Sequence, residues 1–309
     1  MAQQSNAYWR RVYRITFPDI GLEYNNTDDP NNEAINISFD IDRDLTQETN
    51  KAKIKLWNLV GADRSKIEKE DQKLELYAGY RDNGGAQRIF TGTIIQAYSE
   101  DKGTDIITEI TGSDGQIPVR DTAVSLSYAP GTDGGTIVKA VAGQMGIPLV
   151  EGEGVSYEAY PHGYSFVGRA AEALNEVCNG QGLNWSIQNG ELQVILGFGV
   201  AAQTGVVFSS STGLVGFPPT RIVQSRPKED KLPGKRQGRQ SAKKEEPEKK
   251  AGWKIETLLC PTVNPGDAVK VESRVVTGWF RIETLKHTGE LYGNDYRTQM
   301  ELIEGLGAS

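Results

Sequence analysis

Hydrophobic and polar residues alternate over most of the first hundred or so residues, a pattern typical of β-strands with one buried and one exposed face. Residues 35–41 show it most clearly, and in residues 51–56 lysines interleave with Ala52, Ile54 and Leu56. Further strands are predicted at residues 12–17, 74–80, 89–98 and 106–111, with a helical turn near 63–67 and turns at Gly84-Gly85 and 101–103. Strands at this spacing predict a barrel or sandwich.

The middle of the chain changes to a helical period. One apolar helical face is formed by Ile137, Val138, Val141, Ala142 and Met145. A second is formed by Phe166, Val167, Ala170, Ala171, Leu174, Val177 and Cys178. A hairpin is then expected over residues 183–195, with its turn at Gln188-Asn189-Gly190. The pattern predicts a small α+β unit inserted between two β units.

The last part of the chain returns to period two. Early strands are expected near residues 206–223, and residues 258–303 form three blocks that each predict a β-strand. The turn signals between these blocks are Pro265-Gly266-Asp267, residues 287–290 and residues 293–295.

Residues 225–251 differ from the rest in composition. Residues 226–250 hold ten Lys or Arg against five Asp or Glu, and the segment has no aromatic residue. Such a composition predicts a disordered charged loop. The whole chain has a net charge of −7, so the chain outside residues 226–250 has a net charge of −12. Such an acidic body argues against nucleic-acid binding as the main role.

The overall composition sets further limits. The chain has 309 residues with 35 Gly and 13 Pro, enough for two or three domains built from many short elements. We expect synthesis in a cytoplasm and no membrane anchoring, because no targeting signal or apolar run of about 20 residues is seen. Cys178 and Cys260 are expected to be free thiols.

Two sets of motifs carry a family resemblance. Near the C-terminus these are the Pro265-Gly266-Asp267 turn feeding residues 268–271, the Gly278-x-Phe-x-Ile strand, the His287-x-Gly turn and the closing Thr298-x-x-Glu strand. Near the N-terminus they are Lys-Leu-Trp-Asn-Leu at 55–59, Tyr-Ala-Gly-Tyr at 77–80 and Ile-Phe-Thr-Gly-Thr-Ile at 89–94. The N-terminal set resembles the first barrel, and the C-terminal set the second barrel, of baseplate hub proteins from contractile-tailed bacteriophages. These proteins are the T4-type hub and tail protein D-like family.

The resemblance implies a mainly β fold, with two similar antiparallel tail-tube-like β-barrels flanking a helix-containing middle domain. The expected domains are residues 1–117, 118–198 and 199–309, the last interrupted by the loop at 225–251. It also implies a homotrimeric ring in the virion tail baseplate that adapts the sixfold tail tube to a threefold central spike. The implied partners are the spike, the tube or tube-initiator protein, the tape-measure protein, and DNA only in transit, for which the acidic body suggests a repelling channel wall.

Two alternatives stay open: a tail-tip peptidoglycan hydrolase, and the hub of a related contractile injection machine such as a tailocin. No catalytic, cofactor-binding or metal-binding residue is assigned. Asp40-x-Asp42-x-Asp44 resembles the start of a calcium loop, but Leu45 replaces the required Gly and Lys51 the bidentate Glu.

The remaining candidates have plain structural interpretations. We expect His287 to fix a turn by a hydrogen bond, and His162 to lie in a loop packed by its own aromatic rings. Residues 131–136 lack the Lys-Ser/Thr of a phosphate loop, and Asp133 or Thr136 is expected to cap the following helix.

Overall fold

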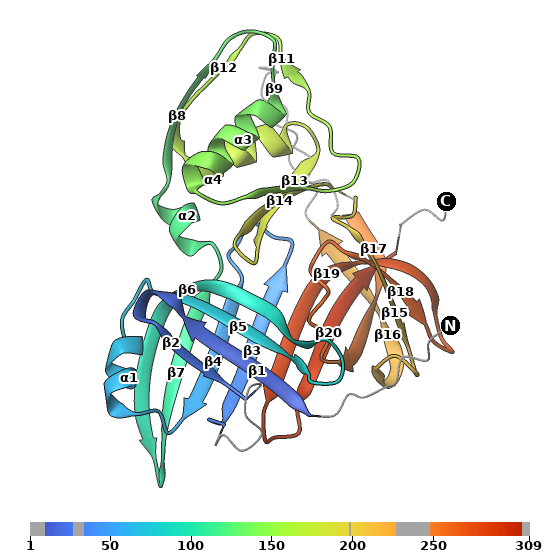
Figure 1. Cartoon of the computed structure of the whole chain (residues 1–309). Coiled ribbons are helices and arrows are strands. Elements are labelled where there is room, and N and C mark those ends of the chain that lie inside the picture. Colours follow the sequence, from blue (N-terminus) through green and yellow to red (C-terminus); the bar gives the residue numbers. More distant parts are fainter. Residues whose placement is uncertain (1–9, 27–33, 198, 227–247, 305–309) are drawn as a thin grey trace.

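The computed structural model describes residues 10–26, 34–197, 199–226 and 248–304. Figure 1 shows two β units side by side with a smaller α+β unit standing above them. The predicted mainly β fold with a small α+β insert is confirmed. Three hydrophobic cores, one for each unit, hold the chain together.

The first β unit follows the alternation in the sequence closely. In β3, for example, Ile37, Phe39 and Ile41 are buried, while Asp40 and Asp42 face outward. Its elements are β1 (Arg11–Phe17), η1 (Pro18–Ile20), β2 (Leu22–Asn25), β3 (Ile37–Asp44), β4 (Lys51–Trp57), α1 (Gly61–Ile67), β5 (Lys73–Tyr80), β6 (Gly85–Lys102) and β7 (Asp105–Ser113).

The middle unit packs two helices against short strands. Its elements are α2 (Gln116–Asp121), β8 (Ala123–Tyr128), β9 (Thr132–Asp133), α3 (Gly134–Met145), β10 (Leu149–Glu151), β11 (Ala159–Tyr160), β12 (Tyr164–Arg169), α4 (Ala170–Asn179), β13 (Leu183–Gln188) and β14 (Glu191–Leu196). The side chain of Asp133 accepts a hydrogen bond from the N–H of Thr136 at 3.0 Å, which confirms the predicted helix cap. The predicted second helix was wrong at its start, because Phe166 and Val167 lie in β12, paired with β8.

The last β unit contains β15 (Gln203–Ser209), β16 (Leu214–Arg226), β17 (Glu248–Leu258), β18 (Ala268–Glu272), β19 (Thr277–Glu290) and β20 (Tyr296–Ile303). The predicted loop at 225–251 is too long at both ends, since Ser225 and Arg226 on β16 pair with Lys249 and Glu248 on β17. The hydrogen bonds of this ribbon hold those ends in strands. Residues 227–247 lie outside the described residues.

One sheet joins the two β units. Its order is β16-β17-β20-β19-β3-β4-β7-β6-β5-β1-β2, and β18 branches from β19 to pair with β15. The junction is the antiparallel pairing of β3 with β19, which runs from Thr284 opposite Asp44 to Glu290 opposite Ser38. The alternation predicted the strands, but a pairing between segments almost 250 residues apart leaves no mark in a local pattern.

The β19 strand also corrects the predicted turn at residues 287–290. His287 is fully buried inside the strand, and its Nδ1 lies 2.9 Å from the hydroxyl of Thr298 on β20. Gly289 is needed for packing and not for a turn, because a Cβ there would lie 2.2 Å from the Phe39 ring. The chain reverses later, between Glu290 and Tyr296.

The first core is completed from the far end of the chain. Leu259 and Tyr296 are buried in it, although both belong to the last unit in sequence. The Arg11 guanidinium donates hydrogen bonds to the carbonyls of Glu290 and Gly293, both at 2.6 Å. The two β units therefore share both a sheet and a core.

Candidate functional site

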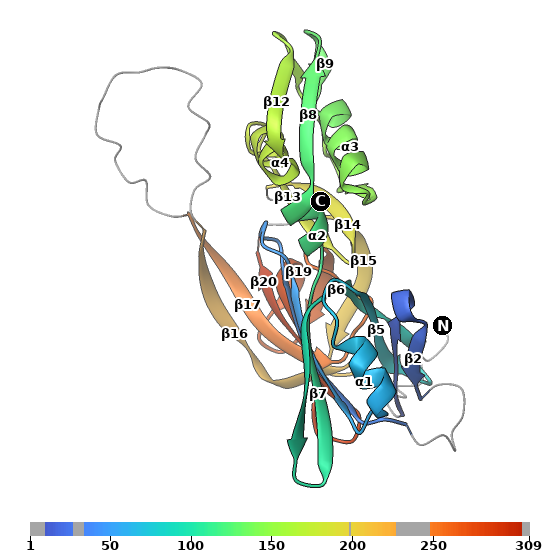
Figure 2. The same ribbon diagram turned by 90° about the vertical axis from the view of Figure 1, so that its left-hand side faces the viewer.

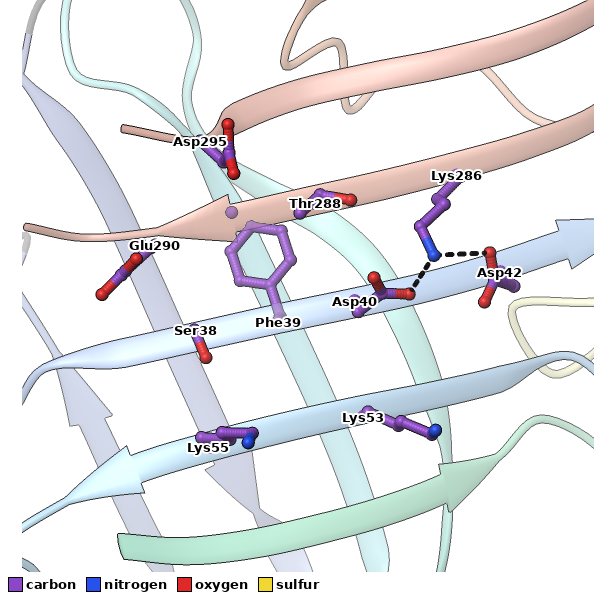
Figure 3. A pocket seen from close by; sticks show the side chains of 11 residues that line it. Ser38, Phe39, Asp40, Asp42, Lys53, Lys55, Lys286, Thr288, Glu290 and Asp295 are labelled. Atoms are coloured by element: carbon purple, nitrogen blue, oxygen red, sulfur yellow. Dashed lines mark hydrogen bonds and ion pairs between the residues drawn. The ribbon is translucent and has the colours of Figure 1, made fainter. Parts of the chain in front are cut away.

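The outward face of the shared sheet carries charged side chains from six neighbouring strands. Figure 3 shows those of β3, β4 and β19 in the middle of this face. Alternation and register put most of the charged residues of β17, β20, β19, β3, β4 and β7 on this side, opposite the cores. Arg43 on β3 and Arg281 and Glu283 on β19 are buried instead. The acidic ones are Asp40, Asp42, Asp44, Asp105, Glu109, Glu256, Glu290 and Glu301. The basic ones are Lys51, Lys53, Lys55, Lys254, Lys286 and Arg297. With these eight acidic and six basic side chains, the polar face carries only a small negative charge.

Ion pairs connect neighbouring strands across the polar face. Lys286 on β19 lies 2.6 Å from Asp40 and 3.3 Å from Asp42 on β3. Lys55 on β4 lies 2.9 Å from Glu109 on β7. Arg297 on β20 pairs with Glu256 on β17. Partly exposed ion pairs of this kind add little to the free energy of unfolding, but they neutralise each other's charges on the face.

A shallow pocket of 380 Å³ opens in the middle of this face, over the junction of β3 and β19. Its lining is mixed in charge, with Lys53, Lys286, Asp40 and Glu290 among the side chains around it. Four acids line it, and two of them, Asp40 and Asp42, pair with Lys286.

The structure separates the three aspartates of the calcium-like pattern. Asp40 and Asp42 bind Lys286, while Asp44 accepts hydrogen bonds from the N–H and hydroxyl of Thr46 at 2.7 and 2.5 Å. All three lie along β3 on its outward face. Within the described ranges, no three His, Cys, Asp or Glu side chains are grouped to hold a metal ion.

A buried polar cluster lies where the three units meet. Arg43 on β3 is 3 % exposed and donates to the Gln188 side chain of the middle unit at 3.0 Å. Asn50 donates to the carbonyl of Ile187 at 2.7 Å, and Asp114 accepts from the N–H of Gly190 at 2.9 Å. These bonds attach the β13–β14 hairpin to the first β unit.

Two further ionisable groups complete this cluster. Asp267 in the last unit accepts from the N–H of Asn264 at 2.8 Å. Burial raises the pKa of both Asp114 and Asp267 to about 6, and burial with the nearby Arg43 charge lowers the pKa of His287 to about 3. Burial also lowers the pKa of Arg43, to about 10. The cluster is a structural joint, since its groups lie inside the fold.

The cluster was not predicted from the sequence, although one signal for it is present. Arg43 occupies the next inward position after Ile37, Phe39 and Ile41, so the alternation places a cation in the core. A buried guanidinium requires partners, which the sequence could not locate.

The cluster leads to a prediction about pH. Asp114 holds its proton more tightly in the folded chain, with a pKa of about 6 against 3.8, so its ionisation lowers the free energy of unfolding as pH rises from about 4 to 6. Asp114→Asn removes this loss. The free energy of unfolding of the variant minus that of the wild type should therefore rise over this window, by about 3 kcal/mol at most. Urea unfolding at pH 4, 5, 6 and 7 measures it.

Taking the difference cancels the contributions of Asp267 and His287, which both proteins share. The control is Asp121→Asn, because Asp121 is exposed and its pKa is lowered by Arg120. For this variant, the free energy of unfolding minus that of the wild type should stay constant between pH 4 and 7. A flat difference for Asp114→Asn as well would contradict the assignment.

His162 is exposed in the turn before β12. Cys178 is a buried free thiol whose pKa is raised by burial, and Cys260 is also free, as expected. Across the described residues, no helix is long and apolar enough to cross a membrane.

Comparison with solved structures shows that the fold is that of phage tail proteins. The 43 kDa tail protein of prophage MuSo2 from Shewanella oneidensis is 11 % identical, with a TM-score of 0.62 over 95 % of this chain and 96 % of that one. A tail protein from Neisseria meningitidis MC58 is 13 % identical, with a TM-score of 0.58 over 96 % and 97 %. The E. coli c3393 protein, described as a type VI secretion component similar to T4 tail proteins gp27 and gp5, is 9 % identical, with a TM-score of 0.57 over 88 % and 74 %.

No curated protein matches the sequence. The sequence model of the baseplate hub gp41 family matches residues 19–218, which is well over half of the chain. The chain therefore belongs to the baseplate hub gp41 family, and its place is the baseplate of a virion tail. The resemblance read from the strand and turn motifs is confirmed.

Proposed function

We propose that the protein is a structural hub subunit that forms a homotrimeric ring, with two tube-like β units from each chain, and adapts a sixfold tail tube to a threefold spike. The observation that carries this proposal is the single sheet that spans both β units. A ring of three chains would present six such units, which matches the symmetry of a tube at one end and of a trimer at the other. The division at residues 1–117, 118–198 and 199–309 is part of this proposal.

In this ring the polar face of the shared sheet lines the channel. The opposite side of the sheet covers the cores and is unavailable. The net charge of −12 outside the basic segment suggested a strongly acidic channel wall. The wall of this ring would be less acidic, because several acids of the polar face form ion pairs with basic side chains. A wall of paired charges offers DNA neither a basic track nor apolar patches for base stacking.

The partners of the ring follow from its position. We propose the central spike below it, the tube or tube-initiator protein above it and the tape-measure protein within reach of the channel. Relatives by fold occur both in phage tails and in a type VI secretion component, so the same architecture serves the hub of a phage or of a related injection machine.

Trimer formation is the first test of this function. Light scattering of the purified protein should give about 101 kDa, three times the 33.8 kDa of one chain. A mass of 33.8 kDa at every concentration would contradict the ring. A cryo-EM map of the assembled tail tip tests the lining as well: it should show the Asp40 and Lys286 side chains facing the channel.

A further inference from the structure

Four enclosed polar atoms at the junction of the three units have no hydrogen-bond partner among the described residues. They are Nε of Arg43, Oδ2 of Asp114, Oδ1 of Asn189 and Nε2 of His287. Arg43, Asp114 and His287 are at most 3 % exposed, and Asn189 is half-buried with its Oδ1 enclosed. An enclosed polar group without a partner costs free energy comparable to a lost hydrogen bond, so these four atoms require one.

The four atoms come from all three units. Arg43 is on β3 of the first β unit, His287 is on β19 of the last, and Asn189 is in the turn between β13 and β14 of the middle unit. Asp114 directly follows β7, where the chain leaves the first β unit. Figure 2 shows β13 and β14 on the side of the middle unit that faces the β units. A partner shared by these atoms therefore lies between the units.

Strand pairing brings Arg43 and His287 together. Leu285 pairs with Arg43 and His287 pairs with Ile41, so Arg43 and His287 are diagonal neighbours on the inward face of β3 and β19. Besides burial, the Arg43 charge contributes to the lowered pKa of His287 and opposes the raised pKa of Asp114, as expected of close neighbours.

Hydrogen bonds to the β13–β14 turn bring the other two residues to the same place. Arg43 donates to Oε1 of Gln188 at 3.0 Å, and Oδ1 of Asp114 accepts from the N–H of Gly190 at 2.9 Å. Asn189 lies between Gln188 and Gly190 in the chain. Arg43, Asp114 and Asn189 therefore meet at one turn.

The hydrogen bonds of His287 decide which ring nitrogen carries its proton. Oγ1 of Thr298 accepts from the N–H of Cys260 at 2.9 Å and lies 2.9 Å from Nδ1 of His287. The Thr298 hydroxyl donates to Nδ1, since this gives its proton an acceptor. Burial lowers the pKa of His287 to about 3, so the ring is neutral at pH 7 and its proton lies on Nε2.

Two of the four atoms are donors and two are acceptors. Nε of Arg43 and Nε2 of His287 each carry a proton, whereas Oδ2 of Asp114 is a carboxylate oxygen. Asn189 donates through Nδ2 to Asn264 at 3.2 Å, which leaves its Oδ1 as an acceptor. A water molecule accepts two hydrogen bonds and donates two, and is therefore the complement of this set. A metal cation would face the Arg43 guanidinium, and a halide would face the Asp114 carboxylate.

We propose that the junction of the three units is a water-binding site, in which about one or two buried water molecules bridge Arg43, Asp114, Asn189 and His287. The water is a structural ligand that completes the hydrogen bonds which protein groups leave unmade. It connects the hairpin of the middle unit to both β units. The site lies within one chain, so it does not depend on the proposed ring.

A crystal structure of the full chain, at a resolution that shows ordered water, tests the site directly. Density for water should lie within hydrogen-bond distance of at least three of the four atoms. Crystals grown with bromide at neutral pH should give no anomalous peak there, because the Asp114 carboxylate repels an anion. A dry site, or a bromide peak in it, would overturn the proposal.

Magnetic relaxation dispersion of the oxygen nuclei of water tests the site in solution, because it counts the water molecules that a protein holds for long times. Arg43→Met with Asp114→Leu makes the site apolar, and apolar cavities stay dry. This double variant should hold about one or two fewer long-lived water molecules per chain than the wild type.

Arg281→Met with Glu283→Leu is the matched control. It also removes a buried cation and a buried acid, but Arg281 bonds to Glu283 and to the carbonyls of Gly197 and Gly199, which are protein groups. The count of long-lived water molecules should therefore not change. Equal counts in the wild type and in Arg43→Met with Asp114→Leu would contradict the site, and so would an equal loss in both double variants. If the first double variant does not fold, the wild-type crystal structure decides alone.

Discussion

Tyr296→Ala is expected to lower the free energy of unfolding by about 3–5 kcal/mol, as for other large buried aromatic side chains. The Tyr296 ring packs edge-on against Phe39 and Tyr80, with centroids 5.9 and 5.3 Å apart. Its hydroxyl donates to the carbonyl of Val12 at 2.8 Å and accepts from the N–H of Gly79 at 3.1 Å. This one side chain joins the end of the chain to the first core, so its loss weakens the attachment of the two β units.

Tyr296→Phe separates the packing from the hydrogen bonds. It keeps the ring but leaves two buried backbone groups without their partner, and we expect a loss of about 1–3 kcal/mol. Tyr292→Ala is the matched control, because Tyr292 lies four residues earlier, is 69 % exposed and should change stability by less than about 0.5 kcal/mol. Chemical denaturation measures all three. Equal effects at residues 292 and 296 would contradict the assigned role of Tyr296.

Arg281→Met is the second change with a large expected effect, about 3–5 kcal/mol of unfolding free energy. Arg281 and Glu283 are 1 % and 3 % exposed, and the guanidinium Nε lies 2.8 Å from the Glu283 carboxylate. Arg281 also donates to the carbonyls of Gly197 and Gly199 at 3.1 and 2.7 Å, which ties the segment leaving the middle unit to β19. Removing the cation leaves the Glu283 charge buried without its Arg281 partner.

The double variant Arg281→Met with Glu283→Leu should recover much of this loss, because it removes both buried charges. Arg297→Met is the control: its pair with Glu256 on the polar face is partly exposed, so the loss should stay below about 1 kcal/mol. If the double variant is no more stable than Arg281→Met, the buried charge of Glu283 is not what destabilises the single variant.

Much of the local structure was predictable from the sequence. The alternation at residues 35–41 and 51–56 gave β3 and β4, because a strand with one buried face must repeat every second residue. The turn at Asn189-Gly190 and the cap at Asp133 were found from residue types that suit those conformations. The errors arose where one residue type serves two purposes: Gly289 suggested a turn but makes room for the Phe39 ring.

The candidate site was less predictable. The charged residues of the polar face were visible one by one, but their ion pairs join strands that are distant in sequence, such as Lys286 with Asp40. The buried cluster around Arg43 has the same origin, since its partners come from all three units.

The sequence by itself determined the mainly β composition, the helical insert and, through its strand and turn motifs, the baseplate hub family. Only the tertiary structure decided that β3 pairs with β19 and that Tyr296 completes the first core. The physical reason is the range of the interactions. Alternation and turn chemistry act over a few neighbouring residues, whereas strand pairing and core packing join whichever distant segments best satisfy their backbone hydrogen bonds and bury their apolar faces.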